Sequence, residues 1–485
     1  MKQCLAFAAV CAIGLFANGC MVGPKYSKPT TPMAPAFKEQ PPESFKGVDG
    51  WKPAQPADQT LRGKWWEIFG DPQLNALEEE LTVSNQNLKV SEARFRQARA
   101  MIRFNRSAEF PTISTSPSVV NERESPNQPY FNRAYANNGT GDFTLPFDLS
   151  YEVDLWGKIR RTVNASREEA QASAADVQTA SLSLHAELAL DYFELRSADA
   201  QKQLLDDTVT AYTNALQLTQ NLFVGGAAPK SDVAQAQTQL DGARVEDTDV
   251  TVMRADYEHA IATLIGKPPA ELSISFAPKT PLRLPVIPVG LPTTLLERRP
   301  DIAAGERRMA EANEQIGIAT AAYYPSLTLD IAAGLQGNTI ANLFSWASRI
   351  WAVGPQMSET IYDAGRRRSI VESATSNYDG TVAAYRQTTL TAFQQVEDNL
   401  SALRILEHEA QQQQEATASA SESLQLFTNR YKGGVDNYLQ VIIGQTVLLA
   451  NERNDIDLQR RRMDASVLLV KAVGGGWDTT RLPKL

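Results

Sequence analysis

The chain has 485 residues, and its 47 basic and 56 acidic side chains leave a net charge of −9 at pH 7. The basic residues are scattered among acids, which argues against nucleic-acid binding, because that function needs a continuous positive surface. The mean hydropathy of −0.31, with no apolar run of about 18 residues after the N-terminal segment, argues against membrane-spanning helices.

The N-terminus has the order of features found in export signals. Lys2 provides a positive start, residues 5–16 are mostly apolar, and small residues precede Cys20. The segment is similar to a bacterial lipoprotein signal, which implies that residues 1–19 are removed and that Cys20 carries a covalent lipid. An ordinary secretory signal is the alternative. The mature chain would keep Cys20 as its single cysteine, so no disulfide framework and no thiol metal site are expected.

The next segments predict an extended linker and then a helix. Residues 20–60 are rich in proline and lack periodicity, which is typical of an extended tether. Trp65 and Trp66 stand just before a helix start, so they are expected to pack against a later helix, with ligand stacking as the alternative. A first helix is predicted at 74–108, because Pro111 ends the helical pattern.

Apolar and polar residues alternate strictly over 143–153. This period of two predicts a strand with one apolar and one polar face. A length of about 11 residues is that of a strand in a membrane barrel. A weaker strand at 112–120 and a polar, turn-rich loop at 121–140 precede it, so the segment 112–154 is predicted to form a β-hairpin.

A very long helix is predicted after this hairpin. The run 158–223 contains no proline and would be about 100 Å long at 1.5 Å per residue, several times the usual length. Glycines in a predicted tip turn at 224–230 permit a reversal into a further helix at 231–265. Apolar positions four and three residues apart predict a coiled-coil seam formed by Leu205, Val209, Tyr212, Leu216, Thr219 and Phe223.

The same order of elements recurs, so the chain is interpreted as a tandem duplication. Gly157 aligns with Gly365, and the same offset places the glycines of the two tip turns on each other. The first repeat spans 61–275. A linker at 276–292 connects it to the second repeat at 293–477, which is followed by a tail at 478–485. The second repeat is predicted to contain a helix that begins near Thr293 or Pro300, a hairpin at 326–362, a long helix at 366–431, a tip turn at 432–438 and a helix at 439–473.

Four predicted strands per chain cannot close a barrel. An open edge in lipid would leave backbone groups unpaired, at several kcal/mol each, so the chain is expected to oligomerise. Two chains would supply about 8 strands, whose interior fills with side chains, whereas three would supply about 12 and leave room for water. The predicted fold class is an α+β membrane protein, a trimeric 12-stranded β-barrel (four strands per chain) whose tube the long helices continue outside the membrane.

Five segments stand out by their motifs. They are Cys20-Met21-Val22-Gly23-Pro24-Lys25-Tyr26, Leu149-Ser150-Tyr151-Glu152-Val153-Asp154-Leu155-Trp156-Gly157, Leu296-Glu297-Arg298-Arg299-Pro300-Asp301-Ile302, Gly434-Val435-Asp436-Asn437-Tyr438-Leu439 and Gly474-Gly475-Gly476-Trp477. Together they resemble the TolC/OprM family of outer-membrane efflux ducts, in its lipoprotein (NodT-type) branch. The resemblance implies a lipid-anchored homotrimer with a 12-stranded barrel in the outer membrane, continued into the periplasm by a long α-helical barrel. It would passively conduct drugs or other small molecules from an inner-membrane resistance-nodulation-division transporter and a periplasmic membrane-fusion adaptor.

The resemblance also implies roles for the two tip turns. They would close the pore at rest and contact the adaptor through Val224, Gly225, Gly226, Lys432, Gly433, Gly434 and Val435. Asp436 and Tyr438 would lie at the pore constriction. Three copies of the Asp436 carboxylate around one axis would repel one another and favour cations. Alternatively, Asp436 is the N-cap of the helix that follows.

No catalytic or metal site is expected. His185, His259 and His408 stand alone in helical runs, without metal-ligand spacing or a nucleophile motif, and are interpreted as solvated or packing residues. Without a phosphate-binding glycine loop the energy must come from a partner, and no cofactor is expected beyond the lipid on Cys20. Two rival functions remain: a duct for type I protein secretion or metal efflux, and, from a different class, a periplasmic coiled-coil scaffold.

Overall fold

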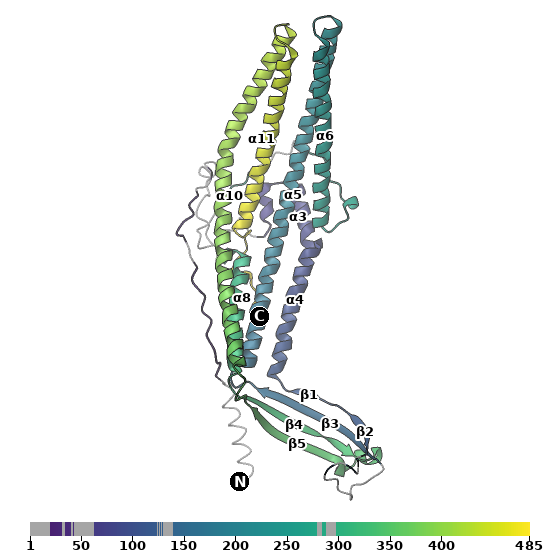
Figure 1. The fold of residues 1–485 in the computed structure, drawn as a ribbon, viewed down its shortest axis with the longest axis vertical. Coiled ribbons are helices and arrows are strands. Elements are labelled where there is room, and N and C mark those ends of the chain that lie inside the picture. Colours follow the sequence, from purple (N-terminus) through teal and green to yellow (C-terminus); the bar gives the residue numbers. More distant parts are fainter. Residues whose placement is uncertain are drawn as a thin grey trace.

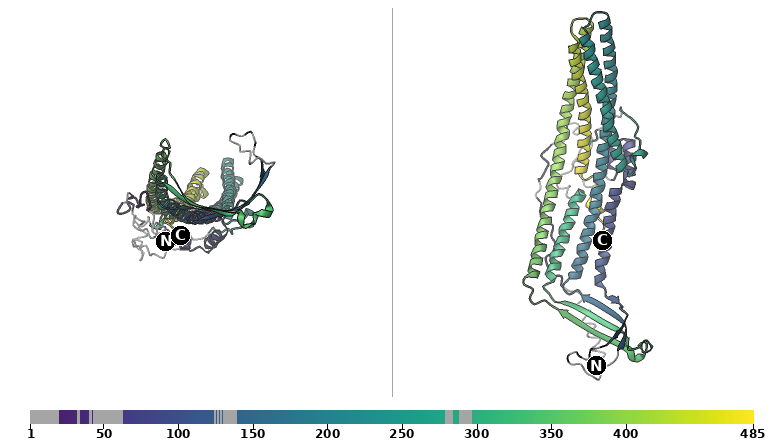
Figure 2. Two further views of the ribbon diagram at one scale, coloured as in Figure 1. Left: turned by 90° about the horizontal axis from the view of Figure 1, so that it is seen from below. Right: turned by 45° about the vertical axis from the view of Figure 1, so that its right-hand side comes forward.

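The protein is an elongated column of helices with a β-sheet at one end (Figure 1). Seen along the column, helices and sheet follow one curved wall (Figure 2). None of the helices in the described part of the chain is both long and apolar enough to cross a bilayer. The signal predicted at 1–19 lies outside the described residues. The computed structural model describes residues 20–31, 34–39, 63–123, 139–278, 284–287 and 297–485, with the single positions 42, 125, 127 and 129.

One antiparallel sheet combines strands from both repeats. β3 and β4 lie at its centre, β5 pairs with β4, and β1 and β2 both pair with β3. The outer edges, at β1/β2 and at β5, have no strand partner within the described residues. The strands are β1 (Thr112–Ser114), β2 (Ser118–Glu122), β3 (Thr140–Val153), β4 (Ser326–Gly337) and β5 (Arg349–Ser358).

The register confirms the two-faced pattern predicted for 143–153. Leu149 of β3 lies opposite Ile331 of β4, which in turn lies opposite Val353 of β5. Directly opposed residues of antiparallel strands point to the same face, so these three side chains form one apolar row across the sheet. The alternation seen in sequence therefore continues across both hairpins.

The hairpin ends differ in detail from the prediction. The strand predicted at 112–120 is divided into β1 and β2 at Pro117, because proline has no N–H to donate to the ladder. The loop predicted at 121–140 lies largely outside the described residues. The second loop contains a short helix, α9 (Ile340–Leu343), and a 3-10 turn, η6 (Trp346–Ser348).

Two pairs of antiparallel rods form the column. The two longest helices have 67 residues each, and their partners have 35 each. Their bounds agree with the predicted ones to within one residue, and α8 begins at the second of its two predicted starts. α8 packs against both long helices. The first rod pair is α5 (Lys158–Val224) with α6 (Lys230–Leu264), and the second rod pair is α10 (Arg366–Lys432) with α11 (Tyr438–Ala472). The shorter helix is α8 (Pro300–Ala321).

The predicted seam of α5 holds the two rod pairs together. Tyr212 and Leu216 lie in one buried cluster with Leu240 of α6 and Val441 of α11. Burial of such side chains removes apolar area from water, worth about 25 cal/mol for each Å². The seam prediction is wrong at its last position, since Phe223 is 44% exposed close to the tip.

The single helix predicted at 74–108 is wrong. The structure has two helices there, α3 (Pro72–Ser84) and α4 (Gln86–Arg106), with Asn85 between them in a non-helical conformation. The side-chain oxygen of Asn85 accepts a hydrogen bond from the Leu88 amide at 2.8 Å, which caps α4. The break lets α3 take its own direction, with Leu74, Leu77 and Leu81 in the largest buried cluster of the column, which is called the waist below.

Equivalent joints connect the upper and lower helices of each repeat. The Asn85 side chain donates to the carbonyl oxygen of Leu264 at the end of α6, at 2.7 Å. In the second repeat Arg299 donates to the carbonyl oxygen of Ala472 at the end of α11, at 3.0 Å, and also to Gln395 of α10, at 2.8 Å. The duplication is therefore visible in individual contacts, although a different residue makes each joint.

The aromatic residues before α3 belong to the core at the waist. Trp65 and Trp66 are 2% and 5% exposed, and Trp66 stacks on His185 of α5 with the ring centres 4.4 Å apart. His185 Nδ1 lies 2.6 Å from the carboxyl group of Glu78. Burial raises the pKa of Glu78 and lowers that of His185 to about 4, so burial disfavours the charged form of both groups. The packing interpretation of these residues is confirmed.

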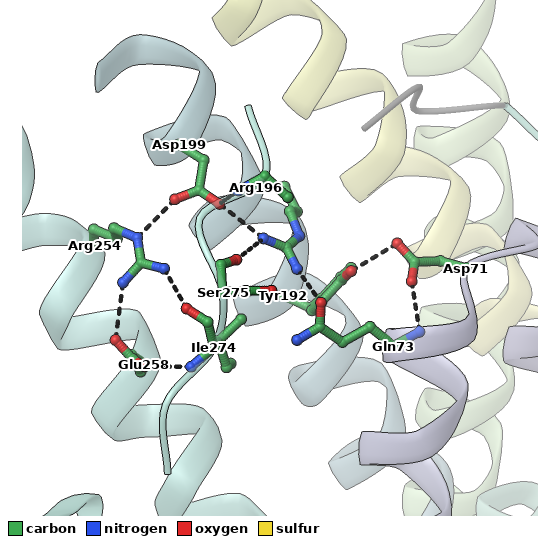
Figure 3. A network of polar contacts seen from close by, with 10 residues as sticks. Asp71, Gln73, Tyr192, Arg196, Asp199, Arg254, Glu258, Ile274 and Ser275 are labelled. Atoms are coloured by element: carbon green, nitrogen blue, oxygen red, sulfur yellow. Dashed lines mark hydrogen bonds and ion pairs between the residues drawn. The ribbon is translucent and has the colours of Figure 1, made fainter. Parts of the chain in front are cut away.

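A buried carboxylate fastens the chain where it leaves the first repeat. Asp199 of α5 is fully buried and lies 2.7 Å from Arg196 and 2.6 Å from Arg254 of α6 (Figure 3). The two guanidinium groups also donate to backbone carbonyl oxygens, Arg196 to Ser275 at 3.0 Å and Arg254 to Ile274 at 2.6 Å. Asp199 thus connects α5 and α6 through the two arginines, and the arginines in turn bind the backbone of residues 274–275, where the chain leaves α6.

Replacing Asp199 by Asn should destabilise the protein strongly. The change leaves the buried Arg196 guanidinium without a charged partner and leaves Arg254 with Glu258 alone, which costs about 3 kcal/mol of unfolding free energy. Asp241→Asn is the matched control, since the Asp241 and Arg244 side chains are 56% and 54% exposed and an exposed pair contributes about 0.5 kcal/mol or less. Thermal unfolding of the purified variants measures both. Equal losses would contradict the role given to Asp199.

Candidate functional site

Two turns close the rod pairs at the end of the column opposite the sheet (Figure 1). The first tip turn, 225–229, connects α5 to α6, and the second tip turn, 433–437, connects α10 to α11. These are the turns for which the sequence predicted contact with a partner and closure of a pore. The candidate site comprises the two tip turns, the sheet and the segment that begins at Cys20.

The two tip turns have the same backbone geometry. Gly226 and Gly434 have φ values of +72° and +71°, in the left-handed region that favours glycine. The next amides, of Ala227 and Val435, donate to carbonyl oxygens in the last turn of the preceding helix, at 2.8 and 3.0 Å. This is the pattern of hydrogen bonds that ends many helices at a glycine.

The residues predicted to contact an adaptor are all at the surface. Val224 is 85% exposed and Val435 is 67% exposed. Exposed aliphatic side chains beside turns of small residues leave room for the close approach of another helix. The remaining members of the predicted set are also exposed: Gly225, Gly226, Lys432, Gly433 and Gly434.

Asp436 forms an ion pair within the second tip turn. Its two carboxylate oxygens accept hydrogen bonds from Arg430 at 2.5 and 3.2 Å. The guanidinium of Arg430 holds the pKa of Asp436 below its ordinary value, so the carboxylate is ionised at neutral pH. The alternative N-cap role is wrong, because the N-cap of α11 is Asn437 and no side chain caps that helix.

Tyr438 lies in the core instead of on the surface. It is 2% exposed, and its ring centre is 5.2 Å from that of Tyr431. Burial raises its pKa to about 12. In this conformation the Tyr438 side chain is not accessible from a pore, so the expected position of Tyr438 at a constriction is wrong. The reason is that the first residue of α11 faces the α10 helix it packs against.

The two tip turns differ in charge. The sequence analysis did not single out Arg430, although a basic and an acidic residue on either side of a tight turn are a recognisable signal. The first tip turn has Leu222 and Ala228 at the positions equivalent to Arg430 and Asp436. The second tip turn is therefore held by an ion pair, whereas the first relies on backbone hydrogen bonds.

The first described residues are fixed at the corner between β3 and α5. The amide of Val22 donates to the carbonyl oxygen of Trp156 at 3.1 Å. Arg161, 3% exposed, donates to the carbonyl oxygen of Pro24 at 3.2 Å. Cys20 is free and exposed beside this corner. The residue predicted to carry a lipid thus lies at the level where the sheet meets the helices.

The segment after this corner is bound to the body. Lys28 forms an ion pair with Glu306 of α8 at 2.6 Å, and Glu39 forms one with Arg404 of α10 at 2.7 Å. Phe37 packs against the core at the waist. The described part of the predicted tether therefore follows the wall of the column (Figure 1).

The polar face of the sheet carries charge of one sign. Ser150 donates to the Asp330 carboxylate at 2.7 Å, and Gln336 donates to the Asp142 carboxylate at 2.9 Å. Within the described strands the register places no Lys or Arg on this face. Its acidic residues are Glu122, Asp142, Asp148, Glu152 and Asp330. Any water enclosed by this face would have a negative wall.

Comparison with known proteins gives matches along most of the chain. The family model described as "Outer membrane efflux protein" matches residues 77–267 and 291–475. The "Probable efflux pump outer membrane protein SepC" of Pseudomonas putida is 31% identical over 468 residues, 96% of each chain. Outer membrane protein OprJ of Pseudomonas aeruginosa is 30% identical over 471 residues, 97% of this chain and 95% of that protein.

Solved structures share the fold. The outer-membrane channel OprN is 28% identical, with a TM-score of 0.83 over 94% of this chain and 100% of that chain. The CmeC outer membrane channel of Campylobacter jejuni has a TM-score of 0.86 over 95% of this chain and 96% of its own, and at 24% identity it compares in fold alone.

Alanine at Gly434 should disturb the second tip turn more than alanine at Gly433. Gly434 needs the left-handed conformation, in which a side chain costs about 1 to 2 kcal/mol, whereas Gly433 has an ordinary φ of −83°. Limited proteolysis of the purified protein should cut Gly434→Ala faster near residues 430–438 and leave Gly433→Ala close to wild type. The reverse order would contradict the turn geometry.

Proposed function

The chain belongs to the outer membrane efflux protein family, and from that premise we propose that it is the trimeric exit duct of a tripartite efflux pump. Its function is that of an outer-membrane channel component of an efflux system, and its family consists of channel proteins. The trimer, the two pump partners, the lipid anchor and the cargo are the finer parts of the proposal. Each rests on particular residues.

One observation carries the proposal: a two-faced sheet with open edges stands at the end of rods of 67 residues. Its apolar face is uncovered, with Trp351 78% and Val353 59% exposed. Such a face belongs in lipid, and in lipid the edges at β1/β2 and β5 require strand partners. Pairing β5 of one copy with the β1/β2 edge of the next satisfies both edges in a ring. Three copies supply about 12 strands, enough for a water-filled interior.

Aromatic residues mark where the sheet would enter and leave the bilayer. Trp346 in the second hairpin loop is 78% exposed, and Tyr362 at the opposite end is 85% exposed. Aromatic girdles at both interfaces are typical of outer-membrane barrels. Cys20 lies at the Tyr362 end, beside the corner between β3 and α5. A lipid on Cys20 would enter the same leaflet that the strands meet there.

The tip turns are the proposed contacts with the periplasmic adaptor, which would link the duct to an inner-membrane resistance-nodulation-division transporter. The rods of about 100 Å would span much of the periplasm. Toluene and antibiotic efflux pumps appear in the names of relatives 29 to 31% identical, so small organic molecules are the proposed cargo. A duct for protein secretion or metal efflux would instead leave drug susceptibility unchanged on deletion.

A charge on the lipid-facing side of β5 should prevent assembly, whereas the same charge one residue away should not. Val353 lies on the apolar face and Ala352 on the polar face. Lys at a lipid-facing position near the membrane centre costs about 2 to 4 kcal/mol, while pore-facing positions tolerate it. Outer membranes of cells carrying Ala352→Lys should contain detergent-stable trimers and restore drug resistance to a deletion strain. Cells carrying Val353→Lys should have neither, and equal assembly of both variants would overturn the membrane placement.

Ion selectivity in planar bilayers should respond in opposite directions to the two members of the tip ion pair. Asp436→Asn leaves Arg430 uncompensated in all three copies and should lower the preference for cations, because the charge near the proposed constriction becomes more positive. Arg430→Gln should raise the preference for cations. The double variant should return close to wild type. Reversal potentials in a salt gradient measure all three, and shifts of the same sign for both single variants would remove Asp436 from the constriction.

A further inference from the structure

The two rod pairs of one chain meet along a seam between α5 and α11. Polar contacts cross from α11 to the first rod pair at three levels. Near the tip Thr446 accepts from Gln239 of α6 at 3.0 Å. Below it Arg453 pairs with Glu246 of α6 at 2.7 Å. Nearer the waist Arg460 pairs with Glu194 of α5 at 2.5 Å. Separation of the second rod pair from the first must break these contacts.

The contact nearest the waist has many more acids than bases. Arg460 lies 2.7 Å from Asp464 and 2.8 Å from Asp457, in addition to its contact with Glu194. Asp191 of α5 interacts with Glu194 and with Glu187 on the same helix. We name Arg460 and these five carboxyl groups the acidic seam cluster. Within the described residues no group of acids, histidines and cysteines has the arrangement of a metal site.

Other helices contribute little compensation to Asp464. From α6, Tyr257 interacts with Glu194, Asp191 and Arg460. From α10, Asp398 lines the same groove as Asp464, and the neighbouring Arg461 of α11 pairs with the exposed Glu409 of α10 at 3.4 Å. One oxygen of Asp464 is buried without a hydrogen-bond partner.

Protons relieve this excess of charge. Burial raises the pKa of Asp464 to about 7 and that of Asp191 to about 6, and the neighbouring carboxylates add to both shifts. Because both pKa values are raised in the packed seam, the stabilisation by protonation is complete below about pH 4, the ordinary value of such groups. It is lost as pH rises through 6 to 7.

The duplication provides an internal comparison. The positions in the second repeat equivalent to Glu187, Asp191 and Glu194 of α5 are Gln395, Asn399 and Ala402 of α10. The position in α6 equivalent to Arg460 is Val252. The three acids of α5 and the central Arg460 therefore have no charged counterpart in the other repeat, whereas Asp457 and Asp464 of α11 correspond to Asp249 and Asp256 of α6. A general need for charge along the rods does not explain this difference.

We propose that the acidic seam cluster is a proton-sensitive joint: protons bound around Arg460 hold α11 against α5, and their loss at higher pH lets the second rod pair move away from the first. Movement of α11 exposes Asp464 and Asp191 to water, where the ionised forms are favoured. A more alkaline periplasm would then favour opening of the tips. The link to opening rests on the proposed function, whereas the link between pH and the seam does not.

The test compares full-length wild type, Asp464→Asn and Asp256→Asn. Asp256 is the equivalent of Asp464 in the first repeat and is exposed, so it is the matched control. Wild type and Asp256→Asn should lose thermal stability as the pH rises from about 4 to 7, the interval between the ordinary and the raised pKa of Asp464. Asp464→Asn, whose side chain at this position is uncharged at every pH, should lose much less. In bilayers the leak through wild type should rise over the same range, by up to about tenfold for each unit by which the pKa of one group falls on opening.

The outcomes test the proton-sensitive joint and the proposed duct separately. A pH dependence of Asp464→Asn equal to that of wild type, or a flat profile for wild type, overturns the joint. If Asp464→Asn does not assemble, Asp191→Asn is measured in its place, with the same expectation for the interval from about pH 4 to pH 6. If wild type conducts no ions at any pH, the proposed duct fails, while the thermal comparison still decides whether the seam responds to protons.

Discussion

The proposed oligomer depends on one constraint, a sheet with an apolar face and two edges that have no strand partner among the described residues. In hydrocarbon each unpaired backbone group costs several kcal/mol, and only closed arrangements of strands avoid that cost. Here the central strands β3 and β4 come from different repeats and pair with each other within one chain. The outer edges, at β1/β2 and at β5, are left for neighbouring copies in the proposed ring. The position of the sheet then directs both rod pairs to the same side of the membrane.

The same duplication allows the two halves to differ where a difference matters. The tip turns have equal backbone hydrogen bonds, yet one carries an ion pair between Arg430 and Asp436 and the other does not. The joints at the waist occupy equivalent places, yet Asn85 makes one and Arg299 the other. Only one seam contains the acidic cluster around Arg460. The backbone geometry is thus repeated, while the side chains at equivalent places differ between the two rod pairs.

Much of this arrangement was readable in the sequence. Period-two alternation over 143–153 predicted both faces of the sheet, and the rods were predicted to within one residue because no proline interrupts them. Asn85 was missed, since one polar residue that ends a helix and caps the next leaves a weak signal within a helical pattern. Tyr438 was placed at a pore because a residue beside a turn gives no indication in sequence of which side it faces.

The sequence by itself determined the strands, the rods, the tip turns and the repeat, because these depend on residues within a few positions of one another and on conformations that proline and glycine restrict. Only the tertiary structure decided which side chains meet across the chain. Arg460 and Glu194, Arg404 and Glu39, and Arg161 and Pro24 are far apart in sequence yet in contact. Such contacts follow from the packing of whole helices, and no local pattern of residues encodes them.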